Sequence, residues 1–166
     1  MQHMTIRKTT EKDVFLAAEI YEDAKKFMRE SGNLTQWADG YPNADSVRED
    51  IAAGVSYVCE DGGEVLAVFM YAVCEEPTYR VIHDGKWLND RPYAVIHRIA
   101  VSDKGRGRGI AAFIFAQCFA KYPNLKIDTH EDNIPMQRAL SRAGFVRCGK
   151  IYLENGEPRL AYHKDK

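Results

Sequence analysis

Apolar residues recur at helical spacing in several stretches of the chain. The clearest stretch is residues 16–28, where the repeat predicts an amphipathic helix. Its apolar positions are Leu16, Ala17, Ile20, Tyr21, Ala24, Phe27 and Met28. Thr10 and Asp13 precede this stretch at the spacing of a capping box, and Ser31-Gly32-Asn33 marks its end. The other expected helices are residues 45–53, 110–120 and 134–143.

Shorter apolar runs between turn residues predict strands. The expected strands are residues 5–8, 55–59, 65–74, 93–101, 125–129, 145–153 and 159–163. Asp61-Gly62-Gly63 and Asn155-Gly156 each stand between two consecutive strands, so both predict antiparallel hairpins. Residues 75–92 are expected to form a loop or a small hairpin. The order of these elements indicates a mixed sheet covered by helices.

The composition is that of one globular domain over residues 1–166, with 45% hydrophobic and 28% charged residues. The net charge of −1 hides an uneven distribution. Residues 1–90 hold nine Lys and Arg against 17 Asp and Glu, whereas residues 91–166 hold 14 against seven. Such an asymmetry is typical of a solvated surface, or it reflects partners of opposite charge for the two halves.

The four cysteines, Cys59, Cys74, Cys118 and Cys148, are far apart and form no C-x-x-C pair. This favours a reduced, intracellular compartment. The N-terminus lacks the apolar stretch of a signal peptide, and no run reaches the ~18 apolar residues of a membrane helix. A cytoplasmic protein without a membrane partner is therefore expected. Whether Met1 to His3 belong to the native protein is left open.

A glycine-rich loop lies between the strand 93–101 and the helix 110–120. It contains Gly105, Gly107 and Gly109, with Arg106 and Arg108 between them. Glycines let a backbone approach a ligand closely, and the first N–H groups of a helix attract anions. Two guanidinium groups would add charge-assisted hydrogen bonds. The segment therefore predicts a pyrophosphate site, and the alternative is a flexible basic loop on the surface.

Two known phosphate-binding patterns fit this segment poorly. Gly107 to Ala112 matches the G-x-G-x-x-A form of the dinucleotide fingerprint, and Asp128 follows at about 20 residues, where a ribose-binding acid stands. However, residues 102–106 separate the strand from Gly107, whereas the dinucleotide turn begins directly at the end of a strand. After Thr129 the chain has only one more helix and a hairpin. A doubly wound sheet cannot be completed, and the P-loop pattern is absent.

The run IAVSDKGRGRGIAAFIF resembles the acyl-CoA binding motif of the GNAT superfamily of N-acyltransferases, Q/R-x-x-G-x-G/A, here residues 106–111. Asn133 and Ala143-Gly144-Phe145 are similar to the N-x-x-A…GF segment of that superfamily, although Met136 stands where alanine is frequent. The resemblance extends over residues 4–164. It implies an α+β fold, with a mixed, mostly antiparallel sheet of about six or seven strands flanked by about four helices.

The resemblance also implies acetyl-CoA as co-substrate and no metal. The backbone of residues 106–111 would hold the pyrophosphate, and the strand 99–101 would contact the pantetheine arm. Asn133 would bond to that arm, act as a plain N-cap, or do both. The implied cofactor-binding residues are Ile99, Ala100, Val101, Arg106, Gly107, Arg108, Gly109, Ile110, Ala111 and Asn133.

His97 is the expected catalytic base, because histidine titrates near neutral pH and an amine must lose a proton before it attacks. Strand alternation places it on the same face as Ile99 and Val101. Its context is similar to that of a histidine in the arylalkylamine N-acetyltransferases of this superfamily, where the pattern is L-H-x-L-A-V. The alternative is a structural histidine in a buried strand.

The general acid is left open. Many members of the superfamily have a tyrosine where this chain has Leu140, so the candidates are Tyr152, Cys148, His130 or no acid at all. His130 has Asp128, Glu131 and Asp132 nearby, but no second histidine or cysteine stands at ligand spacing, so a metal is not expected. A role for His130 in helix capping or in the acceptor site is expected instead.

The expected function is transfer of an acetyl group from acetyl-CoA to a primary amine by direct attack in a ternary complex. The alternatives are a non-catalytic acyl-CoA-binding or regulatory domain and a dinucleotide-binding oxidoreductase. The acceptor is a small-molecule or peptide amine of unknown identity, and neither nucleic acid nor membrane is expected as a partner. The acidic half of the chain and the loop aromatics Trp37, Tyr41, Tyr79 and Trp87 would favour a cationic amine, whereas each aromatic taken singly is more typical of core or edge packing. A homodimer is plausible because symmetric dimers are common.

Overall fold

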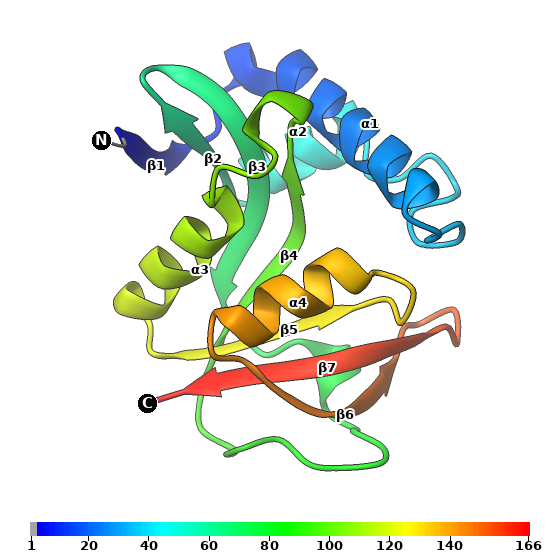
Figure 1. Cartoon of the computed structure of the whole chain (residues 1–166). Coiled ribbons are helices and arrows are strands. Elements are labelled where there is room, and N and C mark those ends of the chain that lie inside the picture. The colour runs from blue at the N-terminus through cyan, green and yellow to red at the C-terminus, as the bar shows by residue number, and fades with distance from the viewer. Residues whose placement is uncertain (1–2) are drawn as a thin grey trace.

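The computed structural model describes residues 3–166 and places seven strands in one mixed sheet (Figure 1). The strands are β1 (Met4–Lys8), β2 (Ser56–Asp61), β3 (Glu64–Val73), β4 (Ala94–Val101), β5 (Asn124–Thr129), β6 (Val146–Tyr152) and β7 (Pro158–Asp165). Their order in the sheet is β1-β2-β3-β4-β5-β7-β6, and only β4 and β5 run parallel to each other. Both predicted hairpins, β2–β3 and β6–β7, are confirmed.

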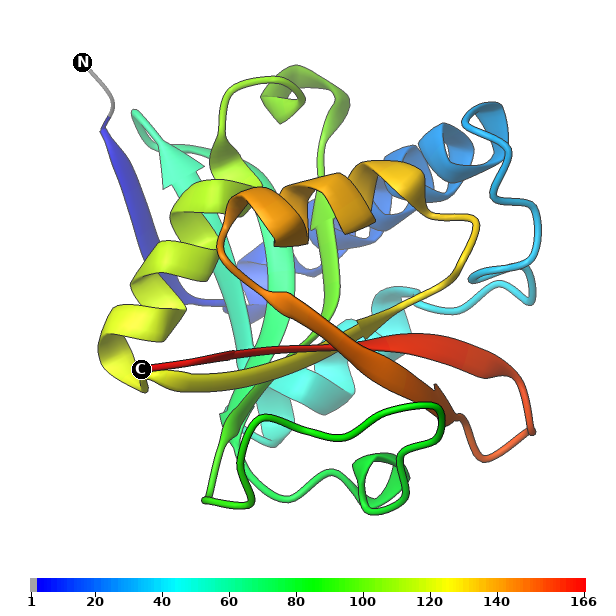
Figure 2. The same cartoon turned by 60° about the horizontal axis from the view of Figure 1, so that its bottom comes forward.

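Four α-helices cover the two faces of this sheet. They are α1 (Val14–Glu30), α2 (Ala44–Ala52), α3 (Ile110–Lys121) and α4 (Ile134–Arg142). In Figures 1 and 2, α3 and α4 lie in front of the sheet and α2 lies behind it. The predicted α+β fold is confirmed. No helix among residues 3–166 is long and apolar enough to cross a membrane.

Three apolar clusters fill the spaces between these layers. The largest packs α3 and α4 against the sheet and includes Ile96, Ile99 and Leu140. A second cluster packs α1 and α2 against the opposite face of the first strands. The third lies under the loop of residues 75–92, where Tyr79 and Tyr93 cover β4, β6 and β7. This loop holds the 3-10 turn Pro77–Tyr79 and a single bridge, so it is a loop rather than a hairpin.

The sheet opens between β4 and β5. The two strands are paired at only two positions, Ala94 with Leu125 and Val95 with Lys126. Beyond these positions they diverge, and Figures 1 and 2 both show β4 running steeply across the direction of β5. The sheet therefore consists of two halves, β1-β2-β3-β4 and β5-β7-β6. The halves are paired only at the start of β4 and β5, and beyond this point the two strands diverge as a fork.

A β-bulge interrupts β4 within this fork. Val68 pairs with Ala100 and Met70 pairs with His97, so Arg98 and Ile99 together oppose the single residue between them on β3. Arg98 takes the left-handed conformation with φ of 52°, as one residue of a bulge often does. The extra residue reverses the alternation of side chains along the strand.

The expectation that His97 shares a face with Ile99 and Val101 is therefore wrong. Ile99 joins Ile96 in the cluster under α3, and Val101 packs against the same cluster. His97 lies on the opposite face, where its ring is 6.0 Å from that of Tyr79. The bulge thus separates the histidine from the strand residues that follow it.

Candidate active site

A cavity of about 750 Å³ lies at the fork between β4 and β5. Ile96, Ile99 and Met136 line it from the α4 side of the sheet, whereas His97 and Glu76 line it from the side of the 75–92 loop. Because lining residues come from both faces, the cavity extends through the gap between the two strands. The loop after α1 closes part of it with residues 35–39 and Tyr41, and the β6–β7 turn contributes residues 153–155 and Glu157.

His97 lies in this cavity between two carboxylates. Its Nε2 is 2.9 Å from Oε1 of Glu76, and its Nδ1 is 4.0 Å from Oδ2 of Asp128. This hydrogen bond lowers the pKa of Glu76 below its ordinary value, so Glu76 is ionised and accepts the bond. The Nε2 atom of His97 therefore carries a proton, and Nδ1 offers a free lone pair whenever the ring is in its neutral form.

Tyr79 holds Asp128 from the far side. Its hydroxyl donates a hydrogen bond of 2.6 Å to the Asp128 Oδ2 that faces His97. Burial, followed by the charge of Asp128, raises the pKa of Tyr79 well above its ordinary value, so this hydroxyl keeps its proton. The four side chains of Glu76, His97, Asp128 and Tyr79 form one connected polar group beside the cavity.

Sequence reasoning found His97 but did not connect it with Glu76, Tyr79 or Asp128. Glu76 follows another glutamate in a loop, and its contact with His97 joins residues 21 positions apart. Tyr79 was considered as an aromatic surface for an amine or as a packing residue. Asp128 was considered as a ribose-binding acid and as a carboxylate near His130. The signal that connects Asp128 with His97 is its position near the end of β5, because β5 lies next to β4 in the sheet.

The glycine loop offers a row of backbone N–H groups at the start of α3. Gly107 and Gly109 have positive φ values of 80° and 76°, and Gly109 stands at the N-cap of the helix. Among residues 3–166, the N–H groups of Gly107, Gly109, Ile110 and Ala111 donate to no protein acceptor. Those of Arg106 and of Arg108 bond to carbonyls within the loop. The free N–H groups and the helix dipole form a site for an anion.

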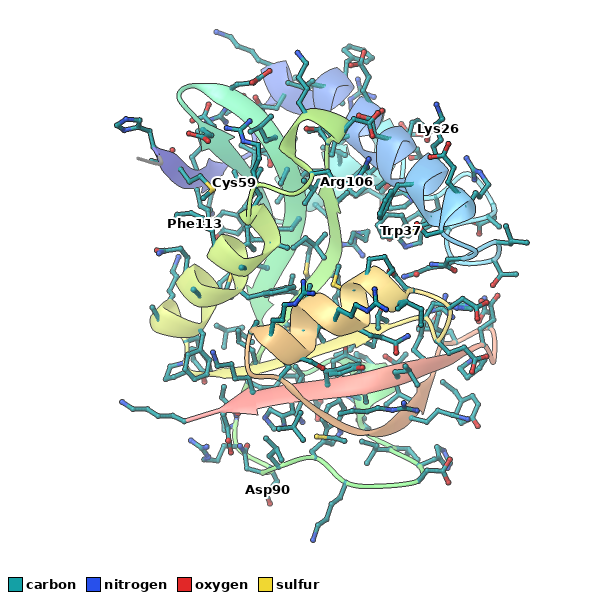
Figure 3. The ribbon with its side chains drawn as sticks, viewed as in Figure 1. Lys26, Trp37, Cys59, Asp90, Arg106 and Phe113 are labelled. Carbon is teal, nitrogen blue, oxygen red and sulfur yellow. The ribbon has the colours of Figure 1, made fainter. Side chains whose placement is uncertain are left out.

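The two arginine side chains of the loop contact acidic residues. Arg106 forms an ion pair of 2.8 Å with Asp103 and lies over the ring of Phe27, at 4.0 Å from its centroid. Arg108 forms an ion pair with Asp61. Figure 3 shows Arg106 beside the N-terminal end of α3, close to α1. These guanidinium groups border the row of N–H groups, and each already has one anionic partner.

The residues of β4 and α3 that were expected to contact a cofactor lie in different environments. Ile99 lines the cavity, Ala100 is buried on the α1 side of the sheet, and Val101 is partly buried on the α3 side. After Val95, β4 and β5 diverge. The edge of β4 on the β5 side therefore forms no further ladder hydrogen bonds among residues 3–166. The side chain of Ile110 is buried in the core, which leaves its backbone as the part available to a ligand.

Asn133 caps α4 and also holds the loop that follows α1. Its Oδ1 accepts a hydrogen bond of 3.2 Å from the N–H of Met136, which confirms the N-cap role. Its Nδ2 donates to Oε1 of Gln36 at 3.1 Å, and Gln36 lines the cavity. Asn133 itself lines the cavity, so it connects the start of α4 with the loop after α1.

His130 makes a second link to the same loop. Its Nδ1 accepts a hydrogen bond of 3.0 Å from the N–H of Asp132, so Nε2 carries the proton and donates it to Oγ1 of Thr35 at 2.8 Å. Both nitrogens are thus satisfied within the protein. This arrangement fits the expected role in local capping.

None of the three candidates for a general acid lines the cavity. Tyr152 is exposed on β6, and burial raises the pKa of Cys148 on the same strand. His130 is buried beneath the loop and fully bonded. Leu140 is fully buried in the core under α3 and α4. Among residues 3–166, no group of three or more His, Cys, Asp or Glu side chains is arranged to hold a metal ion.

Comparisons with known proteins agree with this fold. The sequence model of the Acetyltransferase (GNAT) family matches residues 17–145. The chain belongs to the GNAT family. It is therefore an acetyltransferase, and GNAT acetyltransferases take their acetyl group from acetyl-CoA. No curated protein matches the chain.

Several solved structures share this GNAT fold. A GNAT acetyltransferase from Streptococcus agalactiae is 34% identical with a TM-score of 0.91, and the match covers 98% of this chain and 95% of that one. A GNAT acetyltransferase from Listeria monocytogenes is 20% identical with a TM-score of 0.71, covering 98% and 95%. The protein yncA from Salmonella typhimurium, solved with its cofactor acetyl-CoA, is 15% identical with a TM-score of 0.64, covering 98% and 93%.

Proposed function

We propose that this GNAT protein is an N-acetyltransferase that transfers an acetyl group from acetyl-CoA to a primary amine by direct attack. The observation that carries the proposal is the placement of His97, bonded to Glu76, in the cavity at the fork of the sheet. A histidine fixed by a carboxylate at the point where a cofactor arm and an amine can meet is suited to general base catalysis.

The residues of the glycine loop fit acetyl-CoA. A pyrophosphate needs several N–H donors and room for close approach, and a Cβ added at Gly107 or at Gly109 would meet nothing within 4 Å. We assign the pyrophosphate to the N–H groups of this loop and the pantetheine arm to the open side of β4 at Ile99 to Val101. The Asn133 side chain lies beside this path at the cavity wall.

The side chains around His97 then perform the proton chemistry. Glu76 keeps the proton of the imidazole on Nε2, so Nδ1 accepts a proton from the incoming ammonium group. The charge that forms on the ring is stabilised by Glu76 on one side and by Asp128 on the other. The neutral amine is thereby produced inside the cavity, where it attacks.

When bound, acetyl-CoA supplies an acetyl group on a thioester. The new C–N bond forms as the C–S bond breaks, and the sulfur leaves as a thiolate. Backbone N–H groups on the open side of β4 stabilise the oxyanion that develops in between. Within the described residues 3–166, no cysteine lines the cavity, which favours direct attack over an acyl-enzyme. The attacking nitrogen loses its second proton to the departing thiolate, which gives CoA thiol, and the proton held on Nδ1 of His97 passes to water.

Release of CoA thiol with a panel of primary amines tests this proposal. We expect turnover in the native protein and a kcat reduced about 100-fold in His97→Gln, with unchanged affinity for acetyl-CoA. Tyr152→Phe is the matched control, because Tyr152 lies on β6 outside the cavity, and it should keep full activity. Binding of acetyl-CoA without turnover across the whole panel indicates the alternative, an acyl-CoA-binding domain. Calorimetric binding of NAD(H) in place of CoA indicates a dinucleotide-binding protein.

A further inference from the structure

The acceptor side of the cavity carries more negative charge than the proposed reaction needs. Five carboxylates line it, from the loop after α1, the 75–92 loop, β5 and the β6–β7 turn. They are Asp39, Glu76, Asp128, Glu154 and Glu157. Glu76 and Asp128 are occupied with His97 and Tyr79. Among residues 3–166, Asp39 and Glu154 form no ion pair with any Lys or Arg.

The two arginines that line the same cavity are already neutralised. Arg98 binds both carboxylate oxygens of Asp50, at 2.8 Å and 2.9 Å through Nη2, and it is largely buried. Arg159 is buried as well and lies 3.4 Å from the carboxylate of Glu157. Each of these arginines already has an anionic partner, so neither offers an uncompensated positive charge to a bound carboxylate. The cavity therefore disfavours an acceptor that carries a carboxylate.

Two further features fit a bound cation. Trp37 and Tyr41 line the cavity, as does Asp39. The ring of Tyr41 already has the Arg98 guanidinium 5.9 Å from its centroid, so Trp37 is the ring considered for a bound cation. Figure 3 shows Trp37 below α1 on the side toward α4. Aromatic faces attract ammonium groups. Thr129 also lines the cavity, and its hydroxyl is buried without a hydrogen-bond partner in the described chain. A hydroxyl left in this way is available to a bound molecule that can donate a hydrogen bond.

We infer that the acceptor is an amine with at least one further positive charge, of which an aliphatic diamine is the simplest example. This inference rests on the proposed N-acetyltransferase function. One amine is acetylated beside Nδ1 of His97. The second ammonium group is held by the unpaired carboxylates of Glu154 and Asp39, at the entrance formed by the β6–β7 turn and the loop after α1.

Three acceptors of equal chain length test the charge of the distal end. They are 1,4-diaminobutane, n-butylamine and 4-aminobutanoate, which end in an ammonium, a methyl and a carboxylate group. We expect kcat/KM for the diamine to exceed that for butylamine at least about fivefold, and butylamine to exceed 4-aminobutanoate by a similar factor. Raising the salt concentration from about 20 to about 200 mM should lower kcat/KM for the diamine but hardly change it for butylamine.

Substitution of one carboxylate tests where the second charge binds. Glu154→Gln keeps the size of the side chain, and its exposed position makes a folding defect easy to exclude by thermal unfolding. We expect the ratio of kcat/KM for the diamine to that for butylamine to fall about threefold. Glu19→Gln removes an exposed carboxylate from the outer side of α1, and this control should leave the ratio unchanged.

The outcomes separate the two proposals. If butylamine or 4-aminobutanoate is acetylated as well as the diamine, the inferred acceptor class is wrong, while the N-acetyltransferase function stands. If none of the three amines releases CoA thiol at millimolar concentration, the proposed function fails and the acceptor class fails with it. An unchanged ratio in both Glu154→Gln and Asp39→Asn overturns the binding position for the second charge.

Discussion

The hydroxyl of Tyr79 donates a 2.6 Å hydrogen bond to the Asp128 oxygen that lies 4.0 Å from Nδ1 of His97. The donor belongs to the 75–92 loop, and the acceptor stands near the end of β5. This bond fixes the direction of a charged group next to the proposed base. It also makes the loop part of the site, because Glu76 approaches His97 from the same segment.

Tyr79→Phe should weaken catalysis without removing it. The carboxylate of Asp128 loses its donor, so its charge is less stabilised and acts more strongly on His97. We expect kcat to fall about fivefold, a cost of about 1 kcal/mol for one hydrogen bond, and the acid limb of the pH–rate profile to move to higher pH. A profile that keeps its midpoint while the protein merely loses stability would show that Tyr79 has only a packing role.

Two glycines of one loop should respond differently to alanine. A Cβ at Gly105 would lie 2.7 Å from Cδ1 of Ile110 and 3.0 Å from Cγ1 of Val101. Gly105→Ala should therefore lower the free energy of unfolding by about 1–3 kcal/mol. Gly109→Ala meets no atom within 4 Å but has a φ of +76°, so we expect a cost of about 1 kcal/mol.

Binding of acetyl-CoA distinguishes these two glycines further. Gly109→Ala should raise the Kd measured by calorimetry several-fold, because the N–H groups at the start of α3 change direction. Gly156→Ala is the matched control, since it has a positive φ of 87° and equally open surroundings, but lies in the β6–β7 turn. Equal Kd values for the two variants would remove the pyrophosphate from this loop.

Asn133→Asp should separate the two roles of Asn133. Aspartate still accepts the hydrogen bond from Met136 and suits the N-terminus of a helix, so stability should be kept. It cannot donate to Gln36, so the loop after α1 loses an anchor. We expect the KM for the acceptor to rise about threefold, the effect of one lost hydrogen bond. A matching rise in the Kd for acetyl-CoA alone would instead place Asn133 on the cofactor arm.

Folding stability should fall as the pH decreases from 6.5 to 4 because of His163. Burial, helped by the charge of Lys126, lowers the pKa of His163 from 6.5 to about 4. Its Nδ1 accepts the N–H of Leu88 at 3.1 Å, and its Nε2 lies 2.7 Å from Oδ1 of Asn124, so the neutral ring is fully bonded. Between these pH values the unfolded chain binds more protons, and stability is lost.

Thermal unfolding as a function of pH measures this effect. In the native protein, Tm should decline across that range, and His163→Gln should show a flatter curve from a lower starting Tm at pH 7. His83→Gln, which changes an exposed histidine, should run parallel to the native curve. Parallel curves for all three proteins would contradict the assignment to His163.

The main elements of the fold could be predicted because each is encoded locally. Apolar periodicity marks α1, and the Asn155-Gly156 turn marks the last hairpin. Gly107 and Gly109, in the predicted glycine-rich loop before α3, have the positive φ values that glycine readily adopts. The cap role of Asn133, one of its two expected roles, could be predicted because its side chain acts on the next turn of the same helix. Such features depend on neighbours within a few residues.

The active site depends on contacts that the sequence does not encode locally. The bulge at Arg98 and Ile99 adds one residue to an otherwise regular apolar strand, so the face of His97 was assigned incorrectly. The position of Glu76 depends on how the 75–92 loop packs beneath the sheet, where Trp87 donates to the carbonyl of Tyr79 at 3.0 Å. Tertiary packing, rather than spacing along the chain, brings these groups to the histidine.

The early end of the pairing between β4 and β5 has one more consequence. Although β4 is the fourth of seven strands, beyond Val95 it has the properties of an edge strand. Edge strands in most proteins are protected against unwanted pairing. Here the edge lies inside the molecule, between the two halves of the sheet. An extended ligand with amide groups can thus complete the ladder there.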